Sequence, residues 1–301
     1  MAMDVLAKKA YIGRLRIKTI RLLRGILYGE KSVRIRVHSG LEFDTLRDYA
    51  SGDDVRHIDW NSTARGNKLV VRSYWENRDR AIVLFLDCTS SMRAGSGKVL
   101  KSTVAQEIAS VITLAAEMAC DSLGLVLYFG DRCIEIPLRS RKEHYTHIID
   151  KIVQAYSDYA YSVSTDRLMA REDVPCTYPL PKAVLRVHTI ARKNALILFI
   201  TDGIMSDYEQ AVRVLAARNT VAVIRIIDRY EHAIPKQVLL MCHDPETKTS
   251  VEVDGVNMRR YTEQFFVQQE RRLRACGVRY AQVYAGETYD AAVRMLFVQG
   301  I

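Results

Sequence analysis

The chain has 301 residues, of which 49% are hydrophobic and 26% are charged, a composition typical of a globular protein and not of a disordered chain. Its apolar runs are far shorter than the ~20 residues of a membrane-spanning helix, and lysines and arginines interrupt any signal-peptide core near the N-terminus. The six cysteines are scattered without a CxxC pair, which favours reduced thiols and a cytoplasmic location.

The excess positive charge lies at the N-terminus. The formal net charge is +9, and residues 1–36 hold ten lysines and arginines against two acids. Residues 1–30 are predicted to form a basic amphipathic helical arm, because Leu15, Leu22 and Ile26 recur at helical spacing. The arm could dock on the body of the protein, meet an acidic partner or touch an anionic membrane surface peripherally. No nucleic-acid-binding module accompanies it, so nucleic acid is not an expected partner.

Residues 31–79 are predicted to form a small β-rich subdomain. Residues 33–37 alternate like a half-exposed strand, and residues 68–74 are a second strand candidate. The segment between them is rich in charged and aromatic side chains, and we expect Tyr49 and Trp60 to form a small core there.

From residue 80 the pattern alternates between strands and helices. Strands are predicted at residues 81–86, 123–129, 133–136, 195–201, 221–227 and 278–284, and helices at 98–119, 142–156, 179–191, 207–218, 261–275 and 289–298. A hairpin excursion is expected near residues 238–254. Alternation of this kind predicts an α/β fold with a doubly wound, mostly parallel sheet over residues 80–301.

Oxygen-bearing side chains follow two of the most apolar predicted strands. Asp87, Thr89 and Ser91 form a D-x-T-x-S pattern after the first strand of the alternation, and Asp202 follows another. Ligands of open α/β sheets bind beyond the carboxyl ends of the strands, and hard oxygen donors suit Mg²⁺, Mn²⁺ or Ca²⁺ rather than zinc. The ordinary alternative is that these are loop and helix-cap residues.

The residues around this pattern resemble known families. Asp87-x-Thr89-x-Ser91-Met92 is similar to the metal-ion-dependent adhesion site (MIDAS) of von Willebrand factor A domains, with Thr89 in place of the usual serine. Upstream, Gly52-Asp53-Asp54-x-Arg56-x-Ile58-Asp59-Trp60 resembles the family labelled domain of unknown function 58. The resemblance covers roughly residues 30–300.

This resemblance implies a fold, a further ligand and a partner. The fold is a von Willebrand factor A-like, Rossmann-like domain, and the partner is a MoxR-type AAA+ ATPase beside which the protein acts as a chaperone-like adaptor in assembly or activation of other proteins. The family's site also uses a threonine in a loop before a helix. Thr177 is preferred for that role because a helix and a strand follow it at suitable distances, and Thr165 is its rival.

Three functions follow from these observations. The favoured one is protein–protein interaction, without enzymatic activity, in which a bound magnesium ion accepts an acidic side chain of a partner. A metal-dependent hydrolase using the same oxygens would need a positioned base, and the histidines lie outside the motif loops. The third alternative is a structural scaffold whose site holds no metal.

Overall fold

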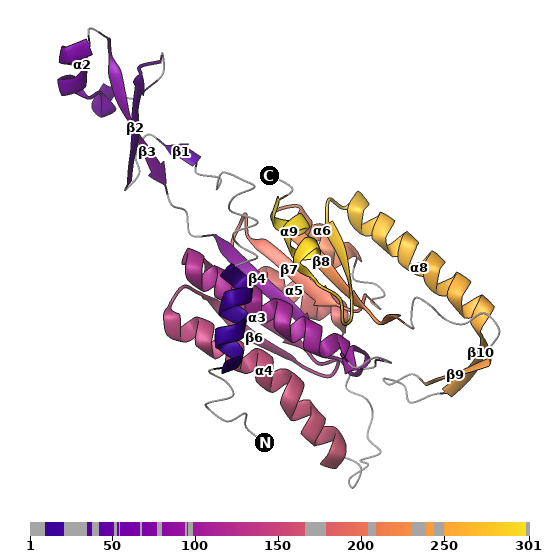
Figure 1. The fold of residues 1–301 in the computed structure, drawn as a ribbon. Coiled ribbons are helices and arrows are strands. Elements are labelled where there is room, and N and C mark those ends of the chain that lie inside the picture. The colour runs from indigo at the N-terminus through magenta and orange to yellow at the C-terminus, as the bar shows by residue number, and fades with distance from the viewer. Residues whose placement is uncertain are drawn as a thin grey trace. The chain divides into compact units, whose positions relative to one another are not determined.

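The computed structural model describes residues 10–20, 35–37, 42–50, 53, 55–66, 68–76, 80–93, 95, 99–165, 179–203, 209–229, 239–243 and 250–298. The chain divides into two compact units (Figure 1). The larger unit comprises Met1–Gly25 and Arg80–Ile301, and the smaller unit comprises Ile26–Asp79.

A six-stranded sheet forms the centre of the larger unit, in the order β11-β8-β7-β4-β5-β6. The strands are β4 (Ala81–Asp87), β5 (Ser122–Tyr128), β6 (Cys133–Arg139), β7 (Leu196–Thr201), β8 (Thr220–Ile227) and β11 (Arg279–Tyr284). All neighbouring pairs are parallel except β5 and β6. The antiparallel strand β6 lies at one edge of the sheet. This arrangement confirms the predicted doubly wound, mostly parallel α/β fold.

The strand order reverses at β4. The chain leaves β4 through α3 (Lys101–Ala119) and enters β5 on one side, and later returns through α5 (Leu180–Ile190) to β7 on the other side. β4 and β7 are therefore the two strands at the switch point, where the loops after neighbouring strands diverge and leave room for side chains.

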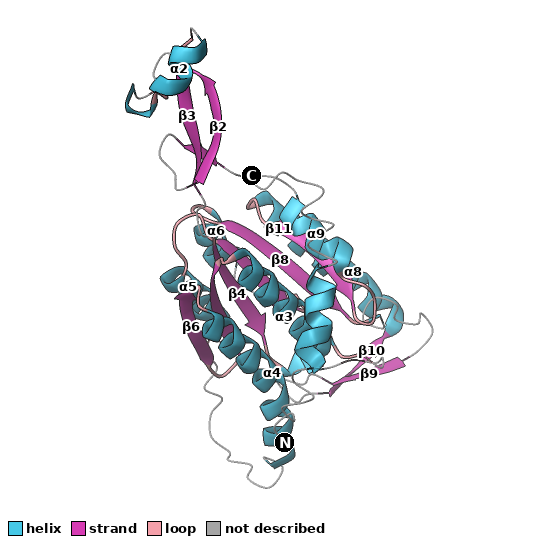
Figure 2. Cartoon of the chain, turned by 60° about the vertical axis from the view of Figure 1, so that its left-hand side comes forward, coloured by secondary structure: helices cyan, strands magenta, loops and turns pink. Residues whose placement is uncertain are grey.

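Helices cover both faces of this sheet. α3 packs against α4 (Lys142–Thr165) on one face (Figure 2), and α5 packs against α6 (Glu209–Ala216) on the other. Alternate strand residues therefore meet different helices. The side chains that gather with α5 and α6 in one buried core include Val83, Phe85, Ile197, Phe199, Val221, Val223, Val184, Val187, Val212 and Leu215.

The central strand is apolar throughout because both of its faces are covered. Every residue of β4 is buried, which is why its sequence is a continuous run of apolar residues instead of an alternation. Helix α4 continues to Thr165, nine residues beyond the predicted end at residue 156. The polar and aromatic composition of its last turns hides the helical period on which the prediction relied.

The helix at residues 10–20 packs on α3 of the larger unit. Leu15 is buried there, Arg16 pairs with Glu117 at 3.2 Å, and Lys18 pairs with Glu107 at 3.1 Å. For residues 10–20 of the predicted basic arm, the structure has the docked arrangement among those that the sequence left open. At least two of its positive charges therefore face acids of the same chain.

The C-terminal part of the larger unit contains a hairpin and two helices. β9 (Leu239–His243) and β10 (Ser250–Asp254) form the predicted hairpin as a two-stranded antiparallel sheet. α8 (Gly255–Ala275) then precedes β11, and α9 (Asp290–Val298) packs on β11. No helix within the described parts of the chain is long and apolar enough to cross a membrane.

The described residues of the smaller unit form a three-stranded antiparallel sheet, a 3₁₀ helix (Val55–His57) and a short α-helix. Its strands β1 (Ile35–Val37), β3 (Val70–Glu76) and β2 (Glu42–Asp48) lie in that order. Asp59 caps α2 (Trp60–Gly66) by accepting the backbone N–H groups of Asn61 and Ser62. The expectation that Trp60 is a core residue is wrong: as the first residue of α2 it is 65% exposed.

Candidate metal centre

The two predicted carboxylates lie at the switch point of the sheet. Asp87 is the last residue of β4, and Asp202 directly follows β7. Since β4 and β7 are paired in parallel, their carboxyl ends lie at the same edge of the sheet. The strands thus bring to one edge two residues that are 115 positions apart in the sequence.

Hydroxyl groups surround the carboxylate of Asp87. One oxygen, Oδ1, accepts hydrogen bonds from the Thr89 backbone N–H at 3.1 Å and from Thr89 Oγ1 at 2.6 Å. The other, Oδ2, accepts one from Thr201 Oγ1 at 2.8 Å. Ser91 Oγ lies 2.9 Å from Thr89 Oγ1. Asp87, Thr89 and Ser91 therefore converge, as the D-x-T-x-S pattern predicts.

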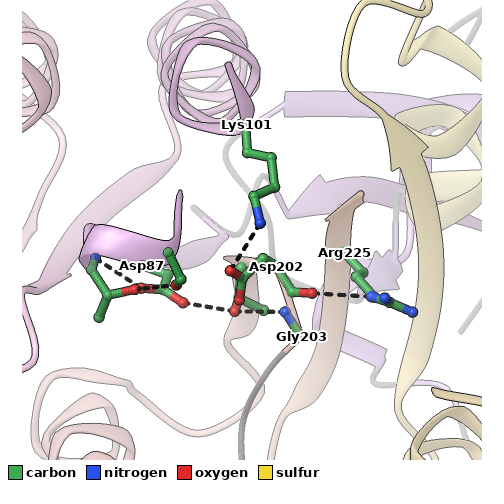
Figure 3. Close-up of polar contacts among 8 residues, drawn as sticks. Asp87, Lys101, Asp202, Gly203 and Arg225 are labelled. Carbon is green, nitrogen blue, oxygen red and sulfur yellow. Dashed lines mark hydrogen bonds and ion pairs between the residues drawn. The ribbon is translucent and has the colours of Figure 1, made fainter. Parts of the chain in front are cut away.

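Asp202 is held by groups from two other elements (Figure 3). Lys101, the first residue of α3, points at it and donates from Nζ to Asp202 Oδ2 at 3.3 Å. From β8, Arg225 Nε donates to the backbone oxygen of Asp202 at 3.0 Å, and its guanidinium lies over the ring of Phe266. Helix α3 and strand β8 thus fix Asp202 from two sides.

Gly203 allows the chain to turn directly after Asp202. Its φ is +85°, in the left-handed region that favours glycine. A Cβ at this position would lie 2.8 Å from Arg225 Cδ, which is closer than side chains tolerate. The Gly203 N–H also donates to Thr201 Oγ1 at 3.1 Å. Glycine is therefore required to keep Thr201, Asp202 and Arg225 in these positions.

Burial makes the site electrostatically unfavourable when both acids are ionised. Asp87 is 4% exposed and Asp202 is 2% exposed. Burial, the largest cause, and the negative charge of Asp202 together raise the pKa of Asp87 to about 7, against the lowering effect of the hydrogen bonds from Thr89 and Thr201. A nearby cation would relieve this repulsion.

Cys88 lies inside the motif loop but is not a nucleophile there. It is fully buried, and burial and the charge of Asp87 raise the pKa of its thiol well above the ordinary range. Because the thiolate is the reactive form, Cys88 is inert. Tyr156 of α4 covers the same region and donates its hydroxyl to the backbone oxygen of Asp87 at 2.8 Å.

The side chains present fit a hard divalent cation. Two carboxylates and the hydroxyls of Thr89 and Ser91 are oxygen donors of the kind that Mg²⁺, Mn²⁺ and Ca²⁺ take. No group of three or more His, Cys, Asp or Glu suited to a metal occurs in the part of the chain that the structure describes. Hydroxyls or water would therefore have to supply the remaining positions. Thr177 lies outside the described residues, and Thr165 is the last residue of α4.

Sequence reasoning missed four buried polar residues of this region. They are Lys101, Thr201, Arg225 and Asp228, the residue directly after β8. Asp228 had a signal, since it ends a strongly apolar strand as Asp87 and Asp202 do. Thr201 and Arg225 also had one, as polar residues in otherwise apolar strands. Lys101 had none, because a lysine in the first turn of a helix is ordinarily exposed.

The fold and this site define a class of protein: a doubly wound α/β protein with two buried carboxylates and two hydroxyls at the switch point of its sheet. Comparison with known sequences gives the family. The chain belongs to the family described as Protein of unknown function DUF58, whose family model matches residues 45–275. This span includes the smaller unit from the middle of β2 onwards and Asp87, Thr89, Ser91 and Asp202 of the candidate centre.

Curated relatives occur in mycobacteria. Uncharacterized protein Mb1516 of Mycobacterium bovis and Uncharacterized protein Rv1480 of Mycobacterium tuberculosis are each 24% identical over 226 residues, covering 75% of this chain and 67% of the relative.

Two solved structures are similar to this chain. The SpRpn10 VWA domain is 9% identical, with a TM-score of 0.35, over 74% of this chain and 99% of that domain. An uncharacterized membrane spanning protein from Vibrio fischeri is 14% identical, with a TM-score of 0.24, over 72% of this chain and 94% of that one. The doubly wound fold is shown by the strand order of the sheet itself.

Proposed function

We propose that this chain is a protein-binding adaptor that uses a divalent cation, Mg²⁺ in the first place, to hold an acidic side chain of its partner. The observation that carries the proposal is the convergence of Asp87, Thr89 and Ser91 beside the neighbouring strand end that bears Asp202. In this arrangement two carboxylates and two hydroxyls supply oxygen donors for one ion. Thr177 is proposed as a further ligand from the preceding loop.

The chemistry of this donor set favours binding over catalysis. Hydroxyls are neutral ligands, so a cation held partly by Thr89 and Ser91 keeps much of its charge. Mg²⁺ requires near-octahedral coordination and usually keeps several waters, and one of these can be exchanged for a carboxylate from outside. The cation, when bound, would supply an electrophilic position for that carboxylate. The two carboxylates and the hydroxyls of Thr89 and Ser91 would hold the cation in place.

A hydrolase would need a base beside the metal, and no observation favours one here. His144, on α4, has its ring nitrogen 2.8 Å from the backbone oxygen of Leu123. Leu123 is at the beginning of β5, so this histidine lies toward the amino edge of the sheet, opposite the candidate centre. We therefore propose that the protein is not an enzyme. Phosphoester turnover by the wild type but not by Asp87→Ala would contradict this.

The proposed partner is a MoxR-type AAA+ ATPase, in the cytoplasm, with the adaptor assisting the assembly or activation of other proteins. This follows from the family resemblance in the sequence. The docked helix at residues 10–20 bears on the proposed peripheral membrane contact. Since Arg16 and Lys18 pair with acids of α3, fewer positive charges are available to a membrane surface.

The proposal can be tested with a purified MoxR-type ATPase from the same organism. Binding to the immobilised chain would be measured with Mg²⁺ and with EDTA, for the wild type, Asp87→Ala and Asp131→Ala. Asp131 is a matched control because it is an exposed acid of the β5–β6 turn, paired with Arg132. We expect Mg²⁺-dependent binding by the wild type and the control and none by Asp87→Ala. Equal recovery in EDTA would refute metal dependence.

A further inference from the structure

A buried lysine lies beside the candidate metal centre. The side chain of Lys101 is 1% exposed and that of Asp202 is 2% exposed. Nζ of Lys101 lies 3.3 Å from Oδ2 of Asp202. Lysines are almost never fully buried unless they are paired, and burying an ammonium group is strongly unfavourable without such a partner. An ordinary surface position would avoid this penalty, so the placement requires an explanation beyond packing.

Lys101 also sits where positive potential is already present. It is the first residue of α3, whose N-cap Leu100 makes no side-chain capping hydrogen bond. The first turn of a helix carries partial positive charge from its unpaired N–H groups. Lys101 adds a full charge at the same end, directed at Asp202 (Figure 3). The region around Asp202 is therefore biased against an additional cation.

The charges of the buried groups can be counted. Asp87 and Asp202 each carry one negative charge when ionised, and Lys101 carries one positive charge. Arg225 and Asp228 are also buried and, having opposite signs, add no net charge. These five buried groups therefore carry one surplus negative charge, and a divalent cation would leave them with one surplus positive charge. A single carboxylate from outside would make the set neutral.

We propose that Lys101 is a specificity-determining residue that leaves the metal-loaded centre with one surplus positive charge, so that the centre requires an anionic partner ligand. Lys101 acts through Asp202 and is not itself a metal ligand. This inference rests on the proposed function, because it needs a cation at the centre. It adds that the cation binds weakly alone and more tightly together with a carboxylate.

Two opposite effects follow from removing the lysine charge. With Lys101→Met the loaded centre is neutral without any partner, so the cation should bind more tightly. The gain should be about tenfold or more, since a unit charge a few ångströms from a divalent cation contributes several RT even at a high effective dielectric constant. Binding of an outside carboxylate should weaken at the same time. Because coupling between two ligands is reciprocal, the metal and the carboxylate should assist each other less in the variant.

The experiment uses Mn²⁺ as the probe and the full chain. Isothermal titration calorimetry would give the Mn²⁺ affinity of the wild type, Lys101→Met and Lys193→Met. Lys193 is an exposed control because it precedes β7, at the amino edge of the sheet. A blocked glutamyl peptide and its glutaminyl counterpart would then be titrated into each Mn²⁺-loaded protein. If Lys101→Met does not fold, Lys101→Gln keeps a hydrogen-bond donor for Asp202 and still removes the charge.

The expected result is tighter Mn²⁺ binding by the Lys101 variant and unchanged binding by Lys193→Met. The preference for the glutamyl over the glutaminyl peptide should be several-fold smaller in the Lys101 variant than in the wild type. Equal or weaker Mn²⁺ binding by a folded Lys101 variant overturns the inference and leaves the proposed function intact. Absence of Mn²⁺ binding by the wild type and both variants overturns the inference together with the metal-dependent function.

Discussion

Replacing Asp87 by asparagine should abolish a pH dependence of stability that the metal-free wild type has. Asparagine has the shape of aspartate, and its amide oxygen can still accept the hydrogen bonds from Thr89 that reach Oδ1. Its amide N–H can donate to Thr201 Oγ1, which now accepts. The substitution therefore removes the buried charge and keeps the contacts with Thr89 and Thr201, with the direction of the Thr201 hydrogen bond reversed.

The magnitude follows from the pKa of Asp87. Burial, together with the charge of Asp202, raises this pKa to about 7 in the folded protein, whereas an aspartate in an unfolded chain titrates at about 3.9. Between these values the folded chain holds a proton that the unfolded chain has released, so stability falls as pH rises. The free energy of unfolding falls by at most about 1.4 kcal/mol per pH unit. Over the interval between the two pKa values, the wild type should therefore lose several kcal/mol of stability. Above pH ~7 the loss is complete and constant.

Urea unfolding in EDTA at pH values from about 5 to about 8 would measure this effect. The wild type and Asp131→Asn, which changes an exposed acid, should become less stable with rising pH. Asp87→Asn should show a distinctly flatter profile and exceed the wild type at the upper end. Parallel profiles for the wild type and Asp87→Asn would show that Asp87 does not retain a proton, and the electrostatic reasoning would be refuted.

Three further substitutions can be checked by urea unfolding at neutral pH. Gly203→Ala should destabilise the protein by roughly 2–4 kcal/mol, because a Cβ at positive φ would displace Arg225; an unchanged midpoint would contradict this. Thr201→Val should cost about 1–3 kcal/mol by removing the donor to Asp87 and the acceptor for the Gly203 N–H, and it should cost less at pH ~5 if Asp87 is then protonated. Leu15→Ala should cost about 2–4 kcal/mol if the helix at residues 10–20 stays docked in solution; a near-zero effect would mean that it does not.

The fold was predictable from the sequence where burial was complete. β4, β7 and β8 are covered on both faces, so their apolar runs were recognisable without any alternation. The closeness of Asp87 and Asp202 was predictable from the topology of parallel strands. The last turns of α4 were not predicted, because polar and aromatic residues there interrupt the helical period.

Other features depend on contacts between distant parts of the chain. Lys101 is an ordinary helix-start residue in the sequence, and only its position beside Asp202, 101 residues away, gives it a role. Trp60 was expected in a core because large aromatic residues are usually buried, but it is the first residue of α2 and is exposed. Local pattern cannot distinguish such cases, since the deciding neighbour lies elsewhere in the sequence.

The antiparallel edge strand β6 limits how molecules of this protein can associate. An open sheet edge presents unpaired backbone N–H and C=O groups, onto which another chain can add a strand. β6 contains Pro137, which has no N–H to offer, and its pairing with β5 shifts register between Leu123 and Leu125. The proline removes one hydrogen-bond donor, and the register shift disrupts the regular ladder of backbone groups with which a strand from another chain would pair. Addition of a strand from another molecule is therefore disfavoured along this edge of the sheet.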